Sequence, residues 1–220
     1  MINIIVPIKD LAQAKQRLGG ILNREQRAGL VLAMLEDLLW TLSSLESCTV
    51  WVVASNPQVF HVAQMCGAQI INEGKSQGYN QAVAFGFKRF TSGPVAVIPG
   101  DVPLASAEEI LQLIRLNKGQ HELIRIAPDR EKKGTNGLFL SRVTLMEPCF
   151  GAHSFTGYQG TAKAKGINVE KISSAGLGLD IDTPADLEQL ISQTHQGATH
   201  QFLQQLGQHF EPQLLKQGAA

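Results

Sequence analysis

The sequence has few cysteines, no excess of charge of either sign and no long apolar run. Its 220 residues include three cysteines, Cys48, Cys66 and Cys149, without Cys-x-x-Cys spacing. A disulfide framework or a zinc site is therefore not expected, and a reducing cytoplasm fits this composition. With 19 basic and 19 acidic residues, the formal net charge is +0. This balance argues against nucleic-acid binding through bulk positive charge.

Signals for membranes and for two common nucleotide folds are also missing. The opening MINIIVPIKD lacks a basic stretch followed by a long apolar one, so no signal peptide is predicted. No window approaches about 18 uninterrupted apolar residues, so no membrane span is expected and we place the protein in the cytoplasm. Neither GxxxxGK[ST] nor GxGxxG occurs, which disfavours a P-loop NTPase and a dinucleotide-binding dehydrogenase.

What the sequence does have is a regular alternation of apolar runs and helical patterns. Hydrophobic residues make up 44% of the chain, enough for a sizeable core in one domain. The expected strands cover residues 2–8, 50–54, 69–71, 95–98, 123–127, 137–140 and 177–181. The expected helices begin after the caps Asn23, Ser106 and Thr183 and also cover 58–65 and 78–90, while 9–20 is expected to be a loop. This alternation predicts an α/β protein with a mostly parallel sheet.

The last 28 residues change character, because glutamine becomes frequent and charge nearly vanishes. We therefore expect one domain over residues 1–192 and a Gln-rich helical tail over 193–220. Phe202, Leu206 and Phe210 are spaced four apart, which is typical of one helix face. Such a helix would pack on the domain or on a second subunit, so a homodimer is one expectation.

Three basic residues, Lys9, Lys15 and Arg17, follow the first predicted strand. Ligands of open α/β sheets bind at the carboxyl ends of the strands, so these cations are placed to hold a triphosphate. The alternative is a solvated basic loop with no ligand, since the spacing alone matches no known phosphate-binding motif.

Three aspartates occupy similar positions near strand ends. Asp101 follows the predicted strand 95–98 in the segment Pro99-Gly100-Asp101, and Asp180 and Asp182 fall in Leu-Asp-Ile-Asp-Thr-Pro. Carboxylates are the oxygen ligands that Mg²⁺ prefers, and two of them on one side of an extended chain repel unless a cation intervenes. The alternatives are that Asp101 caps a turn and that Asp182 caps the following helix.

Small polar residues form two further candidates. Thr135-Asn136 between glycines, and the segment from Gly151 to Ser154, offer hydroxyls and free backbone N–H groups for an acidic ligand. Gly78 and Asn80 stand at a predicted helix start, which suits a base or a phosphate. The alternatives are ordinary surface turns and simple helix capping.

Taken in order, these segments resemble a known family. VPIKDLAQAKQRL resembles its VP.K….AKSRL pattern, GYNQAV its GLN.A, PGDVPL its ADLPL, GTNGL its GTN and FGAHSF its FG..SF, and LDIDTPADL is nearly unchanged from its closing motif. The family is the CofC/FbiD-type guanylyltransferases of coenzyme F-420 biosynthesis. The resemblance runs from Ile4 to Leu190 and implies a MobA-like, nucleotide-diphospho-sugar-transferase-like fold, a three-layer sandwich.

The resemblance implies that GMP from GTP is joined to a phosphorylated three-carbon acid with release of pyrophosphate. The acid would be 2-phospho-L-lactate, phosphoenolpyruvate or 3-phospho-D-glycerate, and the unstable product would be handed to a deazaflavin transferase. Two alternatives stay open: cytidylyl or molybdopterin chemistry on the same fold, and an inactive relative that only binds nucleotide.

The resemblance also assigns roles by position. Lys15 and Asp101 would be catalytic, and Mg²⁺ would lie on Asp101, Asp180 and Asp182. The remaining assignments fall into two groups: the nucleotide would contact Pro7, Lys9, Lys15, Arg17, Gly78, Asn80, Pro99 and Gly100, and the acid would contact Thr135, Asn136, Gly151 and Ser154.

The sequence departs from the family's pattern around the expected pocket. DREKKGTN replaces the usual DRGGTGTN, GDVPL replaces ADLPL, and GYN places a phenol where the pattern has GLN. These changes favour 3-phospho-D-glycerate as the acid, because its extra hydroxyl and shifted phosphate require a reshaped pocket.

Overall fold

The computed structural model describes residues 1–116, 122–193 and 196–209. Within these ranges the chain forms one seven-stranded sheet of order β3-β2-β1-β4-β6-β5-β7. β6 runs antiparallel to β4 and β5, and the other neighbours are parallel. The strands are β1 (Ile2–Pro7), β2 (Cys48–Ala54), β3 (Gln69–Asn72), β4 (Val95–Val97), β5 (Leu123–Pro128), β6 (Thr135–Leu140) and β7 (Asn168–Lys171).

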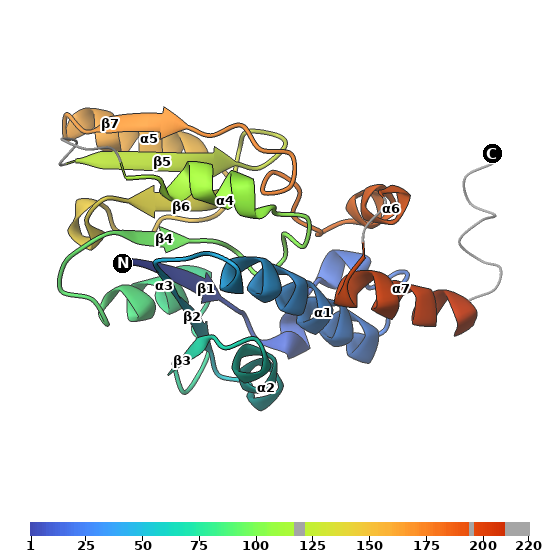
Figure 1. Ribbon diagram of the computed structural model, residues 1–220. Helices are drawn as coiled ribbons and strands as arrows, with labels where there is room; N and C mark the ends of the chain where they lie inside the picture. The colour runs from blue at the N-terminus through green and yellow to red at the C-terminus, as the bar shows by residue number, and fades with distance from the viewer. Residues whose placement is uncertain (117–121, 194–195, 210–220) are drawn as a thin grey trace.

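Helices cover both faces of the sheet, so the expected three-layer sandwich with a mostly parallel sheet is confirmed (Figure 1). One layer contains α1, α2 and α4, and the other contains α3 and α5. The helices are α1 (Arg24–Ser43), α2 (Pro57–Met65), α3 (Tyr79–Phe87), α4 (Ala107–Ile114), α5 (Ser154–Ala164), α6 (Pro184–Ser192) and α7 (Ala198–His209). In the described ranges, each helix is too short or too polar to span a bilayer.

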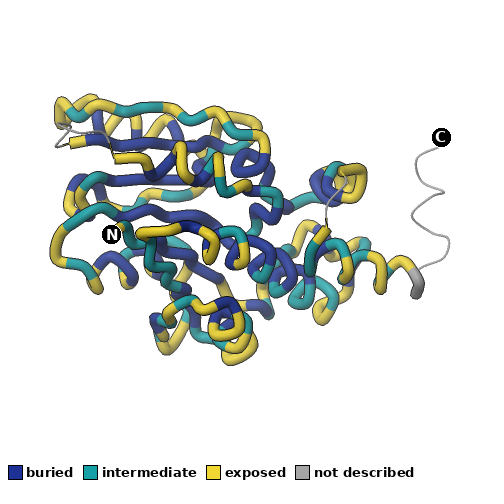
Figure 2. Tube along the Cα trace, in the orientation of Figure 1, coloured by how far each residue is buried: buried dark blue, intermediate teal, exposed yellow. Residues whose placement is uncertain are grey.

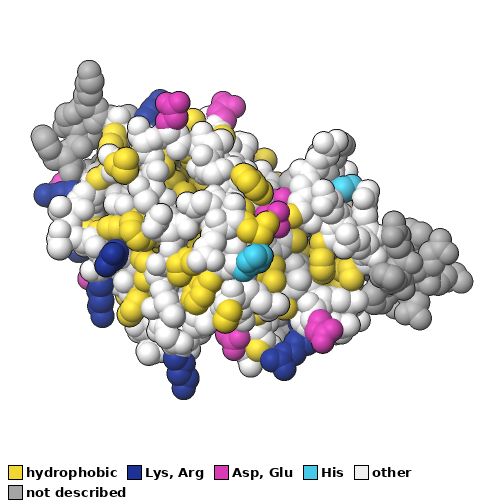
Figure 3. Space-filling view, turned by 60° about the horizontal axis from the view of Figure 1, so that its bottom comes forward, with side chains coloured by type: hydrophobic (Ala, Val, Ile, Leu, Met, Phe, Trp, Pro, Cys, Tyr) yellow, Lys and Arg dark blue, Asp and Glu magenta, His cyan; other side chains and the backbone are white. Residues whose placement is uncertain are grey.

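The central strand β1 is buried on both faces, as its continuous apolar run predicts. Ile4 and Val6 pack with α1 in one hydrophobic cluster, and Ile5 packs with α3 in the other. All three side chains are fully buried, and the dark centre of Figure 2 follows the strands accordingly. Charged side chains are scattered over the face shown in Figure 3, where the described residues form no continuous basic patch.

Local capping signals predicted three helix starts correctly. Asn23 with Gln26 and Ser106 with Glu109 form capping boxes at α1 and α4. Thr183 and Asp186 do the same at α6, where Pro184 is the first helical residue. These pairs provide hydrogen bonds to backbone N–H groups that lack a partner inside the helix. The two residues of each pair are only three positions apart, so the pair can be recognised in the sequence.

Two expected elements differ in the structure. Residues 9–20, expected as a loop, contain two short 3-10 helices, Leu11–Gln13 and Gln16–Leu18, because Leu11 and Leu18 are buried and hold the segment against the core. Residues 177–181 do not form a strand. Their backbone instead crosses the ends of other strands: Ile181 N donates to Asp101 O (3.1 Å), and Gly178 O accepts from Arg130 N (2.9 Å).

The predicted tail helix is α7, and it packs on its own domain. The Asp37 carboxylate of α1 accepts hydrogen bonds from Ala198 N (2.6 Å) and Thr199 N (2.9 Å). Phe202 packs so closely on α1 that a Cβ added at Gly29 would lie 2.6 Å from its ring. Phe210 lies outside the described residues, and the boundary between residues 192 and 193 stays a prediction.

We expect Gly176→Ala to destabilise the fold by about 2 kcal/mol. An added Cβ would lie 2.1 Å from the backbone oxygen of Leu104, which cannot yield easily. Gly176 N also donates to Glu109 Oε1 (2.9 Å), so strain here displaces the segment that leads to Asp180. Urea denaturation of both proteins measures the loss.

The matched control is Gly160→Ala in α5, where a Cβ would meet nothing within 4 Å. This change is expected to stabilise the protein by about 0.5–1 kcal/mol, as alanine does in exposed helix interiors. Equal effects of the two substitutions would contradict the close approach at Gly176.

Candidate active site

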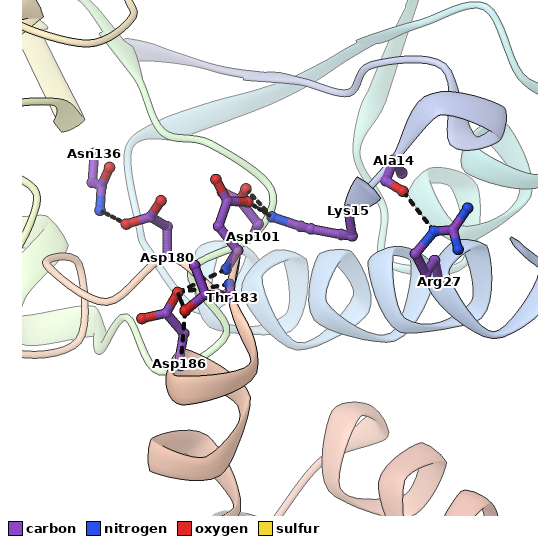
Figure 4. A network of polar contacts seen from close by, with 9 residues as sticks. Ala14, Lys15, Arg27, Asp101, Asn136, Asp180, Thr183 and Asp186 are labelled. Carbon is purple, nitrogen blue, oxygen red and sulfur yellow. Dashed lines mark hydrogen bonds and ion pairs between the residues drawn. The ribbon is translucent and has the colours of Figure 1, made fainter. Parts of the chain in front are cut away.

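Lys15 is the centre of the polar network at the carboxyl edge of the sheet. Its Nζ lies 2.5 Å from Asp101 Oδ2 and 2.6 Å from Asp182 Oδ1, and its side chain is only 6% exposed. Figure 4 shows it reaching across the site toward Asp101. One ammonium group therefore joins two carboxylates that come from distant parts of the chain.

Each of these side chains is placed by a different element. Lys15 stands between the two 3-10 helices with a left-handed backbone (φ 49°), and Arg27 Nε fixes the neighbouring Ala14 O at 3.1 Å. Asp101 follows the end of β4, and Asp182 directly precedes the cap of α6. The backbone bond from Ile181 to Asp101 O holds the two acidic segments side by side.

The charges of the network decide the protonation state of Lys15. Burial alone would lower the pKa of its ammonium group, but the charges of Asp101 and Asp182 and the hydrogen bonds to them raise it more. The net pKa is above the ordinary lysine value, so Lys15 remains protonated at neutral pH. It therefore acts as a fixed positive charge and not as a proton acceptor.

Asp180 lies beside this network and is held by Asn136. Asn136 Nδ2 donates to Asp180 Oδ1 at 2.9 Å (Figure 4). Burial and then the charge of Asp101 raise the pKa of Asp180 to about 6, although the bond from Asn136 opposes the shift. Asp180 is thus a carboxylate whose negative charge is costly in the absence of a further cation.

The small polar residues expected to bind an acid meet at the start of β6 and α5. Ser154 Oγ donates to Thr135 Oγ1 at 3.0 Å, and both residues are buried. Because β6 is antiparallel, it begins where β4 ends. Thr135 and Asn136 therefore lie at the same edge of the sheet as Asp101.

Two adjoining cavities open at this edge. The first, about 340 Å³, is lined by Pro7, Lys9, Lys15, Arg17, Pro99, Gly100, Asp101 and Asp182 among others. The second, about 480 Å³, is lined by Thr135, Asn136, Gly151 and Asp180 among others. Both cavities touch Lys9, Arg17, Tyr79, Pro99, Asp101 and Asp182, so these residues mark the junction.

Three of the predicted residues do not line either cavity. Ser154 lies behind Thr135, and Gly78 caps α3 with φ 104°. The amide of Asn80 is used by the backbone of Phe150: Nδ2 donates to the carbonyl (2.9 Å) and Oδ1 accepts from the N–H (2.7 Å). Asn80 therefore supports the segment that precedes Gly151 and lies behind the cavity wall.

The predicted site residues leave out several residues at the cavities, and the sequence indicated Tyr79 only as a departure from the family's pattern. Tyr79 lines both, and its hydroxyl is buried without a hydrogen-bond partner in the described structure. Burial raises its pKa well above the ordinary value, so it stays a neutral phenol. Gln13 and Gln16 line the first cavity, and only their place near Lys15 could have indicated them.

Comparisons with known proteins identify the family of this chain. The profile of a family described as "Guanylyl transferase CofC like" matches residues 2–219. The chain belongs to this family. The phosphoenolpyruvate guanylyltransferase of Sphaerobacter thermophilus is 33% identical over 203 residues, covering 89% of this chain and 95% of that protein. The 2-phospho-L-lactate guanylyltransferase of Methanocaldococcus jannaschii is 30% identical over 210 residues, covering 95% and 91%.

Solved structures share the fold of this family member at much lower identity. A nucleotidyl transferase from Methanothermobacter superposes with a TM-score of 0.64 at 12% identity, covering 93% of this chain and 99% of that one. A protein of Desulfovibrio desulfuricans G20, assigned as a nucleotide-diphospho-sugar transferase, gives 0.69 at 18% identity, covering 94% and 95%. The expected nucleotide-diphospho-sugar-transferase-like fold is thereby confirmed.

We expect Asp180→Asn to stabilise this CofC-like protein by about 1–2 kcal/mol at pH 7.5 in metal-free buffer. The folded-state pKa of about 6 lies above the ordinary aspartate value of 3.8, so stability falls as the pH rises through this range and the full cost is present at pH 7.5. Most of the gain should disappear at pH 4, where the wild-type carboxyl is protonated in the folded state. Thermal unfolding at both pH values measures it.

Asp186→Asn is the matched control with the opposite sign. Burial raises the pKa of Asp186, but hydrogen bonds from Thr183 and others lower it more, so its net pKa is depressed. Its charge therefore stabilises the fold at pH 7.5, and the substitution should lower the melting temperature there. A loss of stability in both variants at pH 7.5 would contradict the raised pKa of Asp180 in the folded protein.

Proposed function

We propose that this chain is a magnesium-dependent guanylyltransferase that joins GMP from GTP to a phosphorylated three-carbon acid and releases pyrophosphate, in coenzyme F-420 biosynthesis. The observation that carries the proposal is the Lys15–Asp101–Asp182 cluster at the junction of two cavities. Two substrates in adjoining cavities meet where one cluster of charges can act on both. The names of the relatives, guanylyltransferases for phosphoenolpyruvate and 2-phospho-L-lactate, support the same reaction.

GTP would occupy the first cavity. Lys9, Lys15 and Arg17 supply the positive charge for a triphosphate there. Neither Lys9 nor Arg17 forms an ion pair with another described residue, so both remain available to phosphate oxygens. Pro7, Pro99 and Gly100 form the apolar wall beside them.

The phosphorylated acid would occupy the second cavity. Thr135, Asn136 and Gly151 offer a hydroxyl, an amide and backbone N–H groups that suit an anion. The Ser154 hydroxyl holds Thr135 in place, and Lys133 and Arg130 also line this cavity, where they pair with Glu131 and Asp186. This cavity shares Asp101 and Asp182 with the first, which brings the acid's phosphate next to the α-phosphate of GTP.

The reaction then needs alignment and charge neutralisation. An oxygen of the acid's phosphate attacks the α-phosphorus of GTP, one P–O bond forms, and the bond to the β-phosphate breaks as pyrophosphate leaves in line. The attacking oxygen is already ionised, so no side chain has to remove a proton. Lys15, protonated and buried, offsets the negative charge that gathers on the phosphates.

The donor set at the junction suits Mg²⁺. Asp101 Oδ1 is buried without a hydrogen-bond partner in the described structure, and burial together with the charges of Asp101 and Asp182 raises the pKa of Asp180. The described His, Cys, Asp and Glu side chains form no group of three that holds a metal ion by itself, so Mg²⁺ here would need further ligands from phosphates and water. Bound there by Asp101, Asp180 and Asp182, Mg²⁺ would offset phosphate charge.

We further propose 3-phospho-D-glycerate as the preferred acid. Tyr79 and Lys133 line the second cavity at positions where this chain departs from the family's pattern. A phenol and a long cation change the space and the polarity available to the acid. Turnover of phosphoenolpyruvate and 2-phospho-L-lactate without turnover of 3-phospho-D-glycerate would contradict this choice.

The experiment supplies GTP, Mg²⁺ and each of the three acids in turn to the purified protein. The downstream transferase and its deazaflavin acceptor are present to trap the unstable product, which mass spectrometry identifies. One preferred acid, with CTP and ATP inactive, is the expected result. If no product forms with any of the three acids, while a relative is active in the same assay, the proposal is rejected and a nucleotide-binding subunit is favoured.

Ser154→Ala should raise the KM for the acid about five- to tenfold and leave the KM for GTP unchanged. The hydroxyl fixes Thr135 in the second cavity, and one such bond is worth about 1 kcal/mol. Initial rates at varied concentrations of each substrate separate the two constants.

Thr161→Val on the same helix is the control, because its hydroxyl bonds only Gly157 O (3.0 Å) and the residue is exposed. Neither KM should change in this variant. A higher KM for GTP in Ser154→Ala would show that the two cavities hold the substrates the other way round.

A further inference from the structure

Lys15 occupies the position between the two carboxylates that would hold a metal ion. Its Nζ contacts Asp101 Oδ2 and Asp182 Oδ1 directly, at 2.5 and 2.6 Å. Contacts this short leave no space for a second cation between the same two oxygens. The three aspartates at this edge form no group that holds a metal ion in the described structure.

The ammonium also offsets part of the charge that would attract a metal. The two carboxylates paired with Lys15 carry a net charge of about −1 instead of −2, so they attract a dication less strongly than they would without the lysine. A metal ion that binds without a nucleotide has to displace the buried ammonium group of Lys15, and the charge of that group is then left without a partner. The ligand-free protein is therefore built to bind a metal poorly.

A triphosphate is the natural partner that would release Lys15. Lys15 lines the first cavity together with Lys9 and Arg17, so its side chain already borders the space proposed for GTP. The backbone there is anchored: Arg27 Nε donates to Ala14 O (3.1 Å), and Leu18 N donates to Lys15 O (2.9 Å). The flexible four-carbon side chain can thus turn from carboxylates to phosphates without movement of the loop.

We propose that Lys15 is a built-in counter-ion that closes the metal site in the absence of nucleotide, so that the metal binds only together with GTP. The proposal rests on the proposed function, since it takes Asp101 and Asp182 as metal ligands. Binding of the triphosphate would draw the ammonium away and expose both carboxylates, which would then be free to hold the metal. The protein thereby avoids holding a metal that lacks the phosphates it has to act on.

The test measures Mn²⁺ binding to the full-length protein without nucleotide, from the loss of the free-ion electron paramagnetic resonance signal. Lys15→Met should bind Mn²⁺ at least tenfold more tightly than the wild type, because the competing cation is gone. Adding Asp101→Asn to this variant should remove the gain. A merely structural Lys15 would give no gain, and equal or weaker Mn²⁺ binding by a folded Lys15→Met protein would overturn the proposal.

Lys9→Met is the matched control. Lys9 lines both cavities and carries the same charge, but no ion pair joins it to the described carboxylates. Its removal should change Mn²⁺ affinity by less than about threefold, so an equal gain in both variants would overturn a specific role for Lys15. Should Lys15→Met fail to fold, Lys15→Gln carries the same test, because it keeps a polar head group without the charge.

A second arm uses the α,β-methylene analogue of GTP, which cannot transfer GMP. Mn²⁺ should strengthen analogue binding more in the wild type than in Lys15→Met, since only the wild type has a lysine to displace. An equal effect of Mn²⁺ on both proteins would overturn the proposal. Neither arm uses an acid or turnover, so a failure of guanylyl transfer is seen separately from a failure of this inference.

Discussion

One buried ammonium group holds the site of this protein together. Lys15 Nζ joins Asp101 and Asp182, which lie 86 and 167 residues further along the chain. A buried charge is tolerable only when it is paired, so the fold has to keep all three side chains in contact. The ends of β1 and β4 and the segment before α6 are thereby tied to one point, and both cavities open around it.

The topology of the sheet makes this meeting possible. β1 and β4 are adjacent and parallel, so the chain leaves both at the same edge. The antiparallel β6 starts at that edge and brings Thr135 and Asn136 beside Asp101. A fully parallel sheet would place the start of β6 at the opposite end. The one reversed strand therefore places the second cavity beside the first, and we propose that these cavities bind the acid and the nucleotide.

The sequence predicted those features that depend on nearby residues. Apolar runs located six of the strands, and residue pairs such as Asn23 and Gln26 located helix starts. The same reasoning was wrong for residues 177–181. The apolar side chains of Leu177 and Leu179 indicate that the segment is buried, but they do not indicate whether its backbone pairs with a strand of the sheet. It did not find α5, whose residues include two glycines and few apolar side chains, or the short edge strand β7.

The contacts of Lys15 and Asn80 depend on residues far along the chain, so spacing alone could not reveal them.

We propose direct transfer of GMP between two substrates that meet at the Lys15 cluster, without a guanylyl group on the protein. Isotope exchange between labelled pyrophosphate and GTP tests it most directly, since exchange requires reversible cleavage of the α–β bond. Exchange is expected only when the phosphorylated acid is present. Exchange in the absence of the acid would show a covalent guanylyl-protein and contradict it.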